Sequence, residues 1–303
     1  MHKRLALVIG LSIAFFGHVP LVAADDLDGQ GYQPAQELNS SVNAIVNANN
    51  QFGLRATDTD FHYLETNDPV FNAIGPLDEE RGWVPGVTLG LSFMQDAGLK
   101  NLYASAQLSW SRGHTKYIGA SLLGGGRFGS IVDATGATVV DSDFRIGEGF
   151  NVTDYAMLTP YLGFGSHYWD RRVNAGEKYD NDYIGAGLMA QVSPFTATVL
   201  TGYGLIGTTL GSHISVAPIP IIVAGVPSTM PGFDSRLGNS VMFKFGASAD
   251  YALTPQLHIS AGLDTVSYNY GASKPVAVPG GAINEPNSKT TNTTVNIGLG
   301  YGF

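Results

Sequence analysis

The chain has 303 residues, with 25 acidic residues against 16 basic ones and a formal net charge of −9. It contains no cysteine, which excludes disulfides, thiolate catalysis and thiolate metal sites. An acidic chain without clusters of Lys or Arg also argues against nucleic acid as a partner.

Residues 1–24 have the layout of a secretory signal peptide. The basic pair Lys3 and Arg4 precedes an apolar run over residues 5–16, and small residues lead to a cleavage site after Ala24. The apolar run is too short to span a bilayer. The sequence therefore predicts export with removal of this segment, and an uncleaved helix is the alternative.

The composition beyond the signal peptide is unlike that of a soluble domain. Charged residues make up 14% of the chain, against about 25% in soluble proteins. Glycine accounts for 39 residues, nearly twice the usual frequency of roughly 7%. The chain beyond residue 24 has no apolar run of about 18 residues, the length that a transmembrane helix needs. A closed β-barrel crosses a membrane without such helices, because its strands pair every backbone group.

The first part of the exported chain precedes any strand pattern. Residues 25–50 are polar, and we interpret them as a periplasmic N-terminal segment or a short plug. A first strand is expected within "NQFGLRATDTDFHYLE", where Phe52 and Leu54 alternate with Arg55 before the pattern decays at Asp58. Residues 51–303 are predicted to form the barrel.

Further strands follow along the chain as segments in which apolar and polar residues alternate. Nine are clear: 84–94, 102–110, 143–152, 158–169, 183–192, 195–205, 241–253, 256–266 and 293–303. Short turns alternate with long connections over 112–139, 170–181, 208–237 and 271–290. A barrel whose two ends lie in the periplasm needs an even number of strands. With the first strand, the sequence predicts an all-β, antiparallel up-and-down transmembrane barrel of about ten strands, and eight is the alternative.

The final strand, "TTVNIGLGYGF", carries the resemblance to a known class. With its strand and loop layout and its terminal Phe303, the chain resembles small bacterial outer-membrane β-barrel proteins over nearly its whole exported length. The resemblance implies location in the outer membrane of a Gram-negative cell envelope, contact with outer-membrane lipid and lipopolysaccharide, and recognition of the last strand by the barrel-assembly machinery. The ten-strand layout is also similar to that of the omptin proteases. Soluble sandwiches and lipocalin-like barrels share the alternation, but their outer faces carry many charges.

The polar face of the strands collects the candidate lumen residues. We predict a polar cluster of Arg55, Asp143, Arg145, Lys244, Asp250, His258 and Asp264. Such charges either pair across a narrow barrel and fill it, or line a path for an ion or solute.

Aromatic residues are expected where the strands cross the membrane boundaries. The predicted belt is Tyr168, Trp169, Tyr268, Tyr301 and Phe303. Arg171 and Arg172 follow the first two of these residues and are predicted to meet anionic lipid head groups.

No sequence motif supports an enzyme. The omptin resemblance implies acidic residues and a histidine near the outer rim, and His167 lies close to Asp170, but no second acidic pair is found at the matching strand end. A glycine-rich stretch, "SLLGGGRFG", has no following Lys-Ser or Lys-Thr and is interpreted as loop. The sequence thus predicts no catalytic residues, no cofactor and no metal.

The segment 216–233 is the most apolar part of the chain after the signal peptide. It contains Ile219, Ile221, Ile222 and Val223, and its prolines argue against a central strand or a helix. We expect it to fold over the barrel mouth, lean on the outer leaflet, or bind an apolar ligand or partner; a self-packed lid without a ligand is the alternative.

The functional expectation is a non-enzymatic outer-membrane barrel. It would act through its extracellular loops or as a structural barrel with a narrow lumen. A porin-like channel for small solutes or hydrophobic compounds and an omptin-like hydrolase are the alternatives, and the oligomeric state is left open.

Overall fold

The computed structural model describes residues 41–303, apart from 71, 121–126, 174, 224–225 and 279–280. The predicted signal peptide and most of the predicted N-terminal segment therefore lie outside the described residues. The one helix in the described part, α2 (Ser41–Ala48), precedes a series of antiparallel strands. Within that part, no helix is long and apolar enough to cross a membrane.

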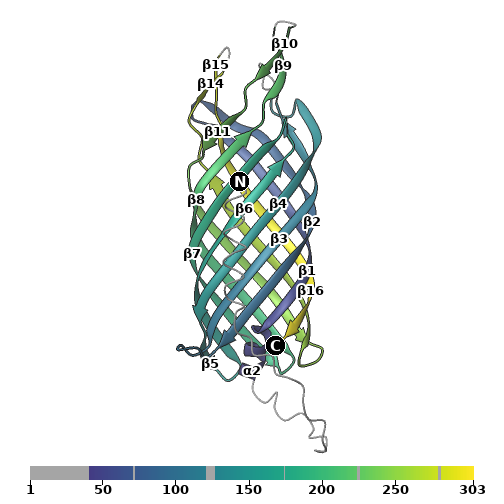
Figure 1. Cartoon of the computed structure of the whole chain (residues 1–303), viewed down its shortest axis with the longest axis vertical. Helices are drawn as coiled ribbons and strands as arrows, with labels where there is room; N and C mark the ends of the chain where they lie inside the picture. Colours follow the sequence, from purple (N-terminus) through teal and green to yellow (C-terminus); the bar gives the residue numbers. More distant parts are fainter. Residues whose placement is uncertain (1–40, 71, 121–126, 174, 224–225, 279–280) are drawn as a thin grey trace, which may run out of the picture. The chain divides into compact units, whose positions relative to one another are not determined.

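Ten strands close into a barrel, so the prediction of fold class and strand number is confirmed. Each strand pairs antiparallel with its neighbours, and the last strand pairs with the first (Figure 1). They are β1 (Gln51–Asp68), β2 (Ala73–Gln95), β3 (Leu102–Gly119), β4 (Ile131–Glu148), β6 (Ala156–Arg171), β7 (Glu177–Phe195), β8 (Thr198–Val216), β12 (Val241–Ala252), β13 (Leu257–Tyr270) and β16 (Asn287–Gly302).

Short strands lie at the two ends of the barrel. β5 (Phe150–Thr153) lies at the same end of the barrel as α2, which we call the helix end (Figure 1). The opposite, loop end carries β11 (Phe233–Arg236) and two hairpins. The hairpins are β9 (Ile219–Val223) with β10 (Val226–Met230), and β14 (Val276–Val278) with β15 (Gly281–Ile283).

The register of the strands places an apolar band on the outer face. Leu54 of β1 lies opposite Leu299 of β16 and Leu89 of β2, and all three side chains are about half exposed. Because side chains alternate between the faces of a strand, the band continues around the barrel. Other exposed members are Phe52, Val87, Leu108, Ile146, Leu162, Phe164, Ile184, Ile206, Phe243, Phe245, Leu263 and Ile297.

The strands are longer than the sequence pattern indicates. β2 has 23 residues, whereas about 9–11 residues cross a bilayer. Towards the loop end of β1 the polarity of the faces is inverted: Phe61 and Tyr63 are fully buried inside, while Asp60 and His62 lie on the outer face. The barrel therefore continues beyond the apolar band as a wall with a polar outside and an aromatic inside.

This extension explains why the predicted connections were too long. The connection predicted over 112–139 is largely strand, because β3 continues to Gly119 and β4 begins at Ile131. The outer face of β3 there carries Arg112, His114 and Lys116, which are polar and exposed. The apolar alternation stops at that level, although the backbone pairing between β3 and β4 does not.

Glycine on the inner face makes room for larger side chains, and Gly298 is an example. A Cβ added at Gly298 of β16 would clash with Cγ of Arg55 and with the Leu54 carbonyl oxygen of the paired strand β1. Gly202 of β8 contrasts with it, because it has the parity of the outward Leu200 and Ile206, and nothing lies within 4 Å of a Cβ built there.

We predict that Gly298→Val lowers the free energy of unfolding by about 1–3 kcal/mol, because overpacking forces strand β1 or Arg55 to move. Gly202→Val is the matched control and should leave stability nearly unchanged. The free energy of unfolding of both variants is measured by titration with urea. The fraction of folded barrel at each urea concentration is read from its heat-modifiable migration. Equal stability of the two variants would contradict the assigned register.

Candidate functional site

The lumen contains two small cavities separated by a layer of polar side chains. The upper cavity, nearer the loop end, has a volume of about 120 Å³, and the lower cavity, nearer α2, has a volume of about 160 Å³. The structure places all seven residues of the predicted polar cluster on the inner wall. Six line the two cavities, namely Arg55, Asp143, Arg145, Lys244, Asp250 and Asp264, and the seventh, His258, contacts Asp250.

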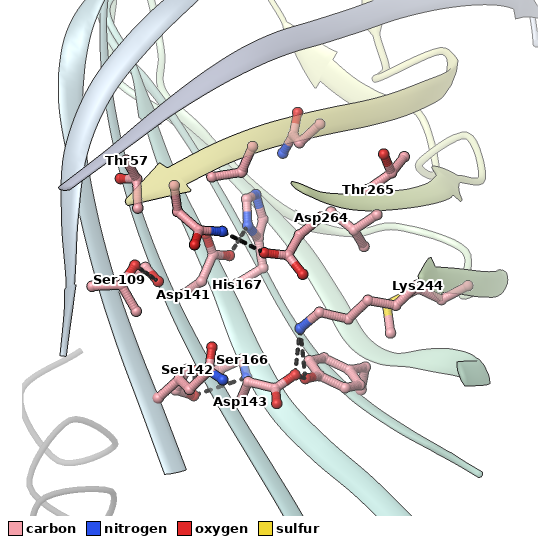
Figure 2. Close-up of a pocket in the computed structure, with 18 of the residues that line it drawn as sticks. Thr57, Ser109, Asp141, Ser142, Asp143, Ser166, His167, Lys244, Asp264 and Thr265 are labelled. Carbon is pink, nitrogen blue, oxygen red and sulfur yellow. Dashed lines mark hydrogen bonds and ion pairs between the residues drawn. The ribbon is translucent and has the colours of Figure 1, made fainter. Parts of the chain in front are cut away.

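Asp143 is the centre of the polar layer. Arg145 Nε donates to Asp143 Oδ1 at 2.8 Å, and Tyr183 OH donates to Asp143 Oδ2 at 2.6 Å. Lys244 Nζ reaches the same carboxylate from the opposite wall (Figure 2). This single buried carboxylate thus joins β4, β7 and β12 across the lumen, and its charge is compensated by two cations.

A second group completes the layer. The guanidinium carbon of Arg145 lies 4.1 Å from the centre of the Tyr203 ring, a cation–π arrangement. Tyr203 OH donates to Asp264 Oδ1 at 2.5 Å, and Asn296 Nδ2 donates to Asp264 Oδ2 at 3.0 Å. The boundary between the two cavities is marked by residues that line both of them, among them Arg55, Arg145, Tyr203, Asp264 and Asn296.

His167 lies inside the lumen rather than at the rim. Its Nδ1 is 2.6 Å from Asp141 Oδ1, and the Asp141 side chain remains 46% exposed in the upper cavity (Figure 2). Within the described part, the buried His167 Nε2 has no hydrogen-bond partner. The partner suggested by the sequence, Asp170, stands on the other face of β6 and takes no part in this pair.

The lumen is filled at the loop end by a buried arginine and its carboxylates. Arg171 Nε donates to Glu80 at 2.6 Å, its Nη1 donates to Glu177 at 2.9 Å, and its Nη2 donates to Asp78 at 2.5 Å. Glu65 lies 3.8 Å from Nη1. These side chains come from β1, β2, β6 and β7, so Arg171 connects four strands.

Aromatic side chains complete this layer. Phe61, Tyr63, Trp169, Tyr179 and Tyr270 are at most 1% exposed. Their ring centres are 4.6–5.7 Å apart along a connected chain of contacts. We call these five rings, with Arg171 and its carboxylates, the loop-end seal. These side chains are almost fully shielded from solvent.

Glu285 ties the loop before β16 to the loop-end seal. Its Oε1 accepts hydrogen bonds from Tyr63 OH at 2.8 Å and from Tyr179 OH at 2.7 Å. Its backbone pairs with Ser273 through two hydrogen bonds, of 2.8 and 2.9 Å. Burial, with the nearby charge of Glu177, raises the pKa of Glu285 to about 7.

The helix end of the lumen is filled by α2. Ile45 is fully buried, as is Met94 of the barrel wall. Asn49 Nδ2 donates to Gln191 Oε1 at 2.7 Å, and Asn50 exchanges two hydrogen bonds of 2.8 Å with the Met94 backbone. We call α2 with Asn49 and Asn50 the helix-end seal. It occupies the last residues of the predicted N-terminal segment, for which a short plug was one interpretation.

Two of the five predicted belt residues were assigned to the wrong face. Trp169 and Tyr268 are 1% and 3% exposed and point into the lumen. Tyr168 and Trp169 are adjacent on one strand, so they cannot both face lipid; Tyr168 takes the outer face. Tyr301 and Phe303 are 61% and 63% exposed on the outside.

The loop-end seal was missed by the sequence reasoning. Arg171 was expected at the lipid head groups, but it has the same parity on β6 as the inward-facing His167 and Trp169. Its carboxylate partners lie in segments where the alternation of apolar residues had already ended. The parity of β6 was the one signal that could have placed Arg171 inside.

The apolar segment 216–233 forms a hairpin rather than an irregular lid. β9 and β10 pair only with each other, and Pro220 and Pro227 are accommodated in this two-stranded edge structure. Ile219 is buried and Ile221 is partly buried, whereas Ile222 is 68% exposed. The side chain of the fourth predicted residue, Val223, lies outside the described part.

Comparison with known proteins bears on the fold. No protein-family model matches the chain, and no curated protein matches it. The outer membrane protease OmpT from Escherichia coli has a similar structure, with a TM-score of 0.56 at 9% identity, covering 84% of this chain and 97% of that chain. The protein has the fold of an outer-membrane β-barrel. Together with the apolar band, this fold places it in the bacterial outer membrane.

Two further structures show more distant likeness to this outer-membrane barrel. The Pseudomonas putida toluene transporter TodX has a TM-score of 0.35 at 12% identity, covering 88% of this chain and 92% of that chain. Neisserial surface protein A has a TM-score of 0.29 at 12% identity, covering 83% of this chain and 97% of that chain.

We predict that Arg171→Met destabilises the barrel by about 3–5 kcal/mol, because it leaves buried carboxylates without their cation. Arg172→Met, at the exposed neighbouring position, is the control and should change the free energy of unfolding by less than about 0.5 kcal/mol. Urea unfolding in detergent micelles measures both. A stable Arg171→Met variant would show that this cluster does not hold the strands together.

Glu285 is predicted to make stability fall as pH rises. Below the ordinary glutamate value of 4.5, the carboxyl is protonated in both states, and its protonated form stabilises the folded barrel. As pH rises from 4.5 through about 7, the unfolded chain loses this proton first and that contribution is lost. At about 1.4 kcal/mol per pKa unit, the loss is on the order of 3 kcal/mol.

The variant Glu285→Gln removes this titration. Relative to the wild type, it should gain stability progressively between pH 4.5 and 7 and keep that gain at higher pH. Urea unfolding at several pH values measures the difference. The same pH dependence in both proteins would contradict the assignment.

Proposed function

We propose that the protein is a non-enzymatic barrel with a closed lumen that acts through its extracellular loop end. The observation that carries this proposal is the loop-end seal. A solute crossing the barrel would have to separate Arg171 from three hydrogen-bonded carboxylates. It would also have to displace the fully buried rings of Tyr63 and Tyr179.

The position of the acid–base groups supports a non-enzymatic role. The His167–Asp141 pair lines the upper cavity, which lies between the loop-end seal and the helix-end seal. A general base must come within hydrogen-bond reach of its substrate. A peptide or polysaccharide at the cell surface has no route to this pair.

The β9–β10 hairpin is the part of the loop end that we propose for contact with partners. Ile222 and Val226 near its tip are 68% and 63% exposed. Ile219 and Met230 at its base are buried, so the hairpin is anchored while its tip presents apolar surface. Exposed apolar surface at such a position favours contact with apolar material outside the cell.

The first test is conductance. Purified wild-type protein reconstituted in planar bilayers should give no discrete conductance steps. An established porin inserted under the same conditions shows that the bilayers report open channels. Regular steps from the wild type would refute a closed lumen.

The second test concerns the hairpin. Cells that display the double variant Ile222→Ser with Val226→Ser should partition less into hexadecane than cells with the wild type, because the apolar tip is lost. Ser228→Ala with Thr229→Ala, on the same exposed hairpin, is the control. Unchanged partitioning of the first variant would exclude the hairpin tip as an apolar contact surface.

A small-solute channel is the second candidate, and the two polar cavities between the seals favour it. In that case each seal acts as a gate, and both must be removed for conduction. Removal of residues 41–48 together with Arg171→Ala should then produce conductance, whereas either change alone should not. A silent, correctly folded double variant would count against the channel.

A further inference from the structure

Two arginines reach the boundary between the upper and lower cavities from different strands. Arg55 belongs to β1 and Arg145 to β4, and both line the upper and the lower cavity. Two guanidinium groups at one boundary bring a high density of fixed N–H donors into a closed lumen.

Arg55 has no partner for its charge. Within the described part of the chain, it makes no hydrogen bond and no ion pair. Its stem packs over Gly298, and Nη2 lies 3.3 Å from the Cβ position of Gly90. The head group is therefore held against the wall at the cavities. A guanidinium removed from bulk water without a counter-charge is costly.

Only some of the hydrogen-bond donors of Arg145 have a partner. Nε donates to Asp143, and its face stacks on Tyr203. Among the described residues, its two terminal nitrogens make no hydrogen bond, although the residue is only 7% exposed. Its remaining donors belong to a group that borders both cavities.

The carboxylates at this level are already engaged. Asp143 accepts from Arg145, Lys244 and Tyr183. Asp264 accepts from Tyr203 and Asn296 and, within the described residues, forms no ion pair. Asp141 and Asp250, the other carboxylates that line the cavities, contact His167 and His258, so none of the four carboxylates forms an ion pair with Arg55.

We propose that this boundary binds one small oxyanion, a carboxylate or a phosphate, between Arg55 and Arg145. The guanidinium fork matches two oxygens of either group. Cavities of about 120 and 160 Å³ on its two sides leave room for a small anion and not for a large solute. The negative charge of the anion compensates the positive charge of Arg55. The anion enters past the helix-end seal, where α2 is a separate element rather than part of the closed sheet, so that this seal excludes large solutes and admits a small anion.

The test is calorimetric titration of the purified full-length protein in detergent, in chloride-free Hepes buffer, with sodium formate and, separately, with sodium phosphate. The wild type should bind at least one of the two saturably, with one anion per barrel, and the two titrations distinguish the carboxylate from the phosphate. Arg55→Gln should weaken binding about tenfold or more, because it removes a charge-assisted contact. The exposed Arg112→Gln is the matched control and should bind as the wild type does.

Heat-modifiable migration establishes that each variant is folded. Arg55→Lys serves if Arg55→Gln does not fold; it keeps the charge and loses the fork, so its affinity should be several-fold weaker than that of the wild type. The absence of saturable binding of both anions to the wild type overturns the proposal. Unchanged affinity in a folded Arg55 variant does so as well.

Discussion

Every backbone N–H and C=O group of this chain that lies in the hydrocarbon must find its partner within the chain. The pairing of β1 with β16 meets this requirement, because it leaves the ten-stranded sheet without an open edge. Closure then fixes the orientation of every side chain. Alternate residues face lipid or lumen, so the outer apolar band and the inner polar layer are two consequences of one register.

The interior is filled by interactions that connect distant strands. Asp143 holds cations from β4 and β12, and Arg171 holds carboxylates from β1, β2 and β7. Each cluster is buried, so its contribution to stability depends on how completely its charges are paired. In the loop-end seal the cation Arg171 is surrounded by four carboxylates, and aromatic rings and Glu285 from the loop before β16 pack around this cluster. The polar layer at the middle leaves Arg55 unpaired, and this difference separates a structural cluster from a candidate binding site.

The sequence was sufficient to predict the closed barrel, its ten strands and the inner position of the polar cluster, because a bilayer enforces alternation. It was insufficient beyond the apolar band. There both water and the barrel interior accept polar groups, so Asp78, Glu80 and Glu177 resemble loop residues although they lie in strands. Trp169 and Tyr268 were misplaced for a related reason: an aromatic residue suits a membrane boundary as well as a buried stack. The parity of each strand, followed residue by residue past the membrane, would have resolved both.

If both ends of the lumen are closed, a bulky reagent cannot reach a thiol inside it. The chain has no cysteine, so single thiols can be placed without background. Asn296→Cys places a thiol at the boundary of the two cavities, and Val226→Cys places one on the exposed hairpin. With a bulky membrane-impermeant maleimide on isolated outer membranes, we expect rapid labelling at 226 and none at 296 until the barrel is unfolded. Labelling of the folded barrel at 296 at a similar rate would show an open passage and contradict closure of the lumen at both ends.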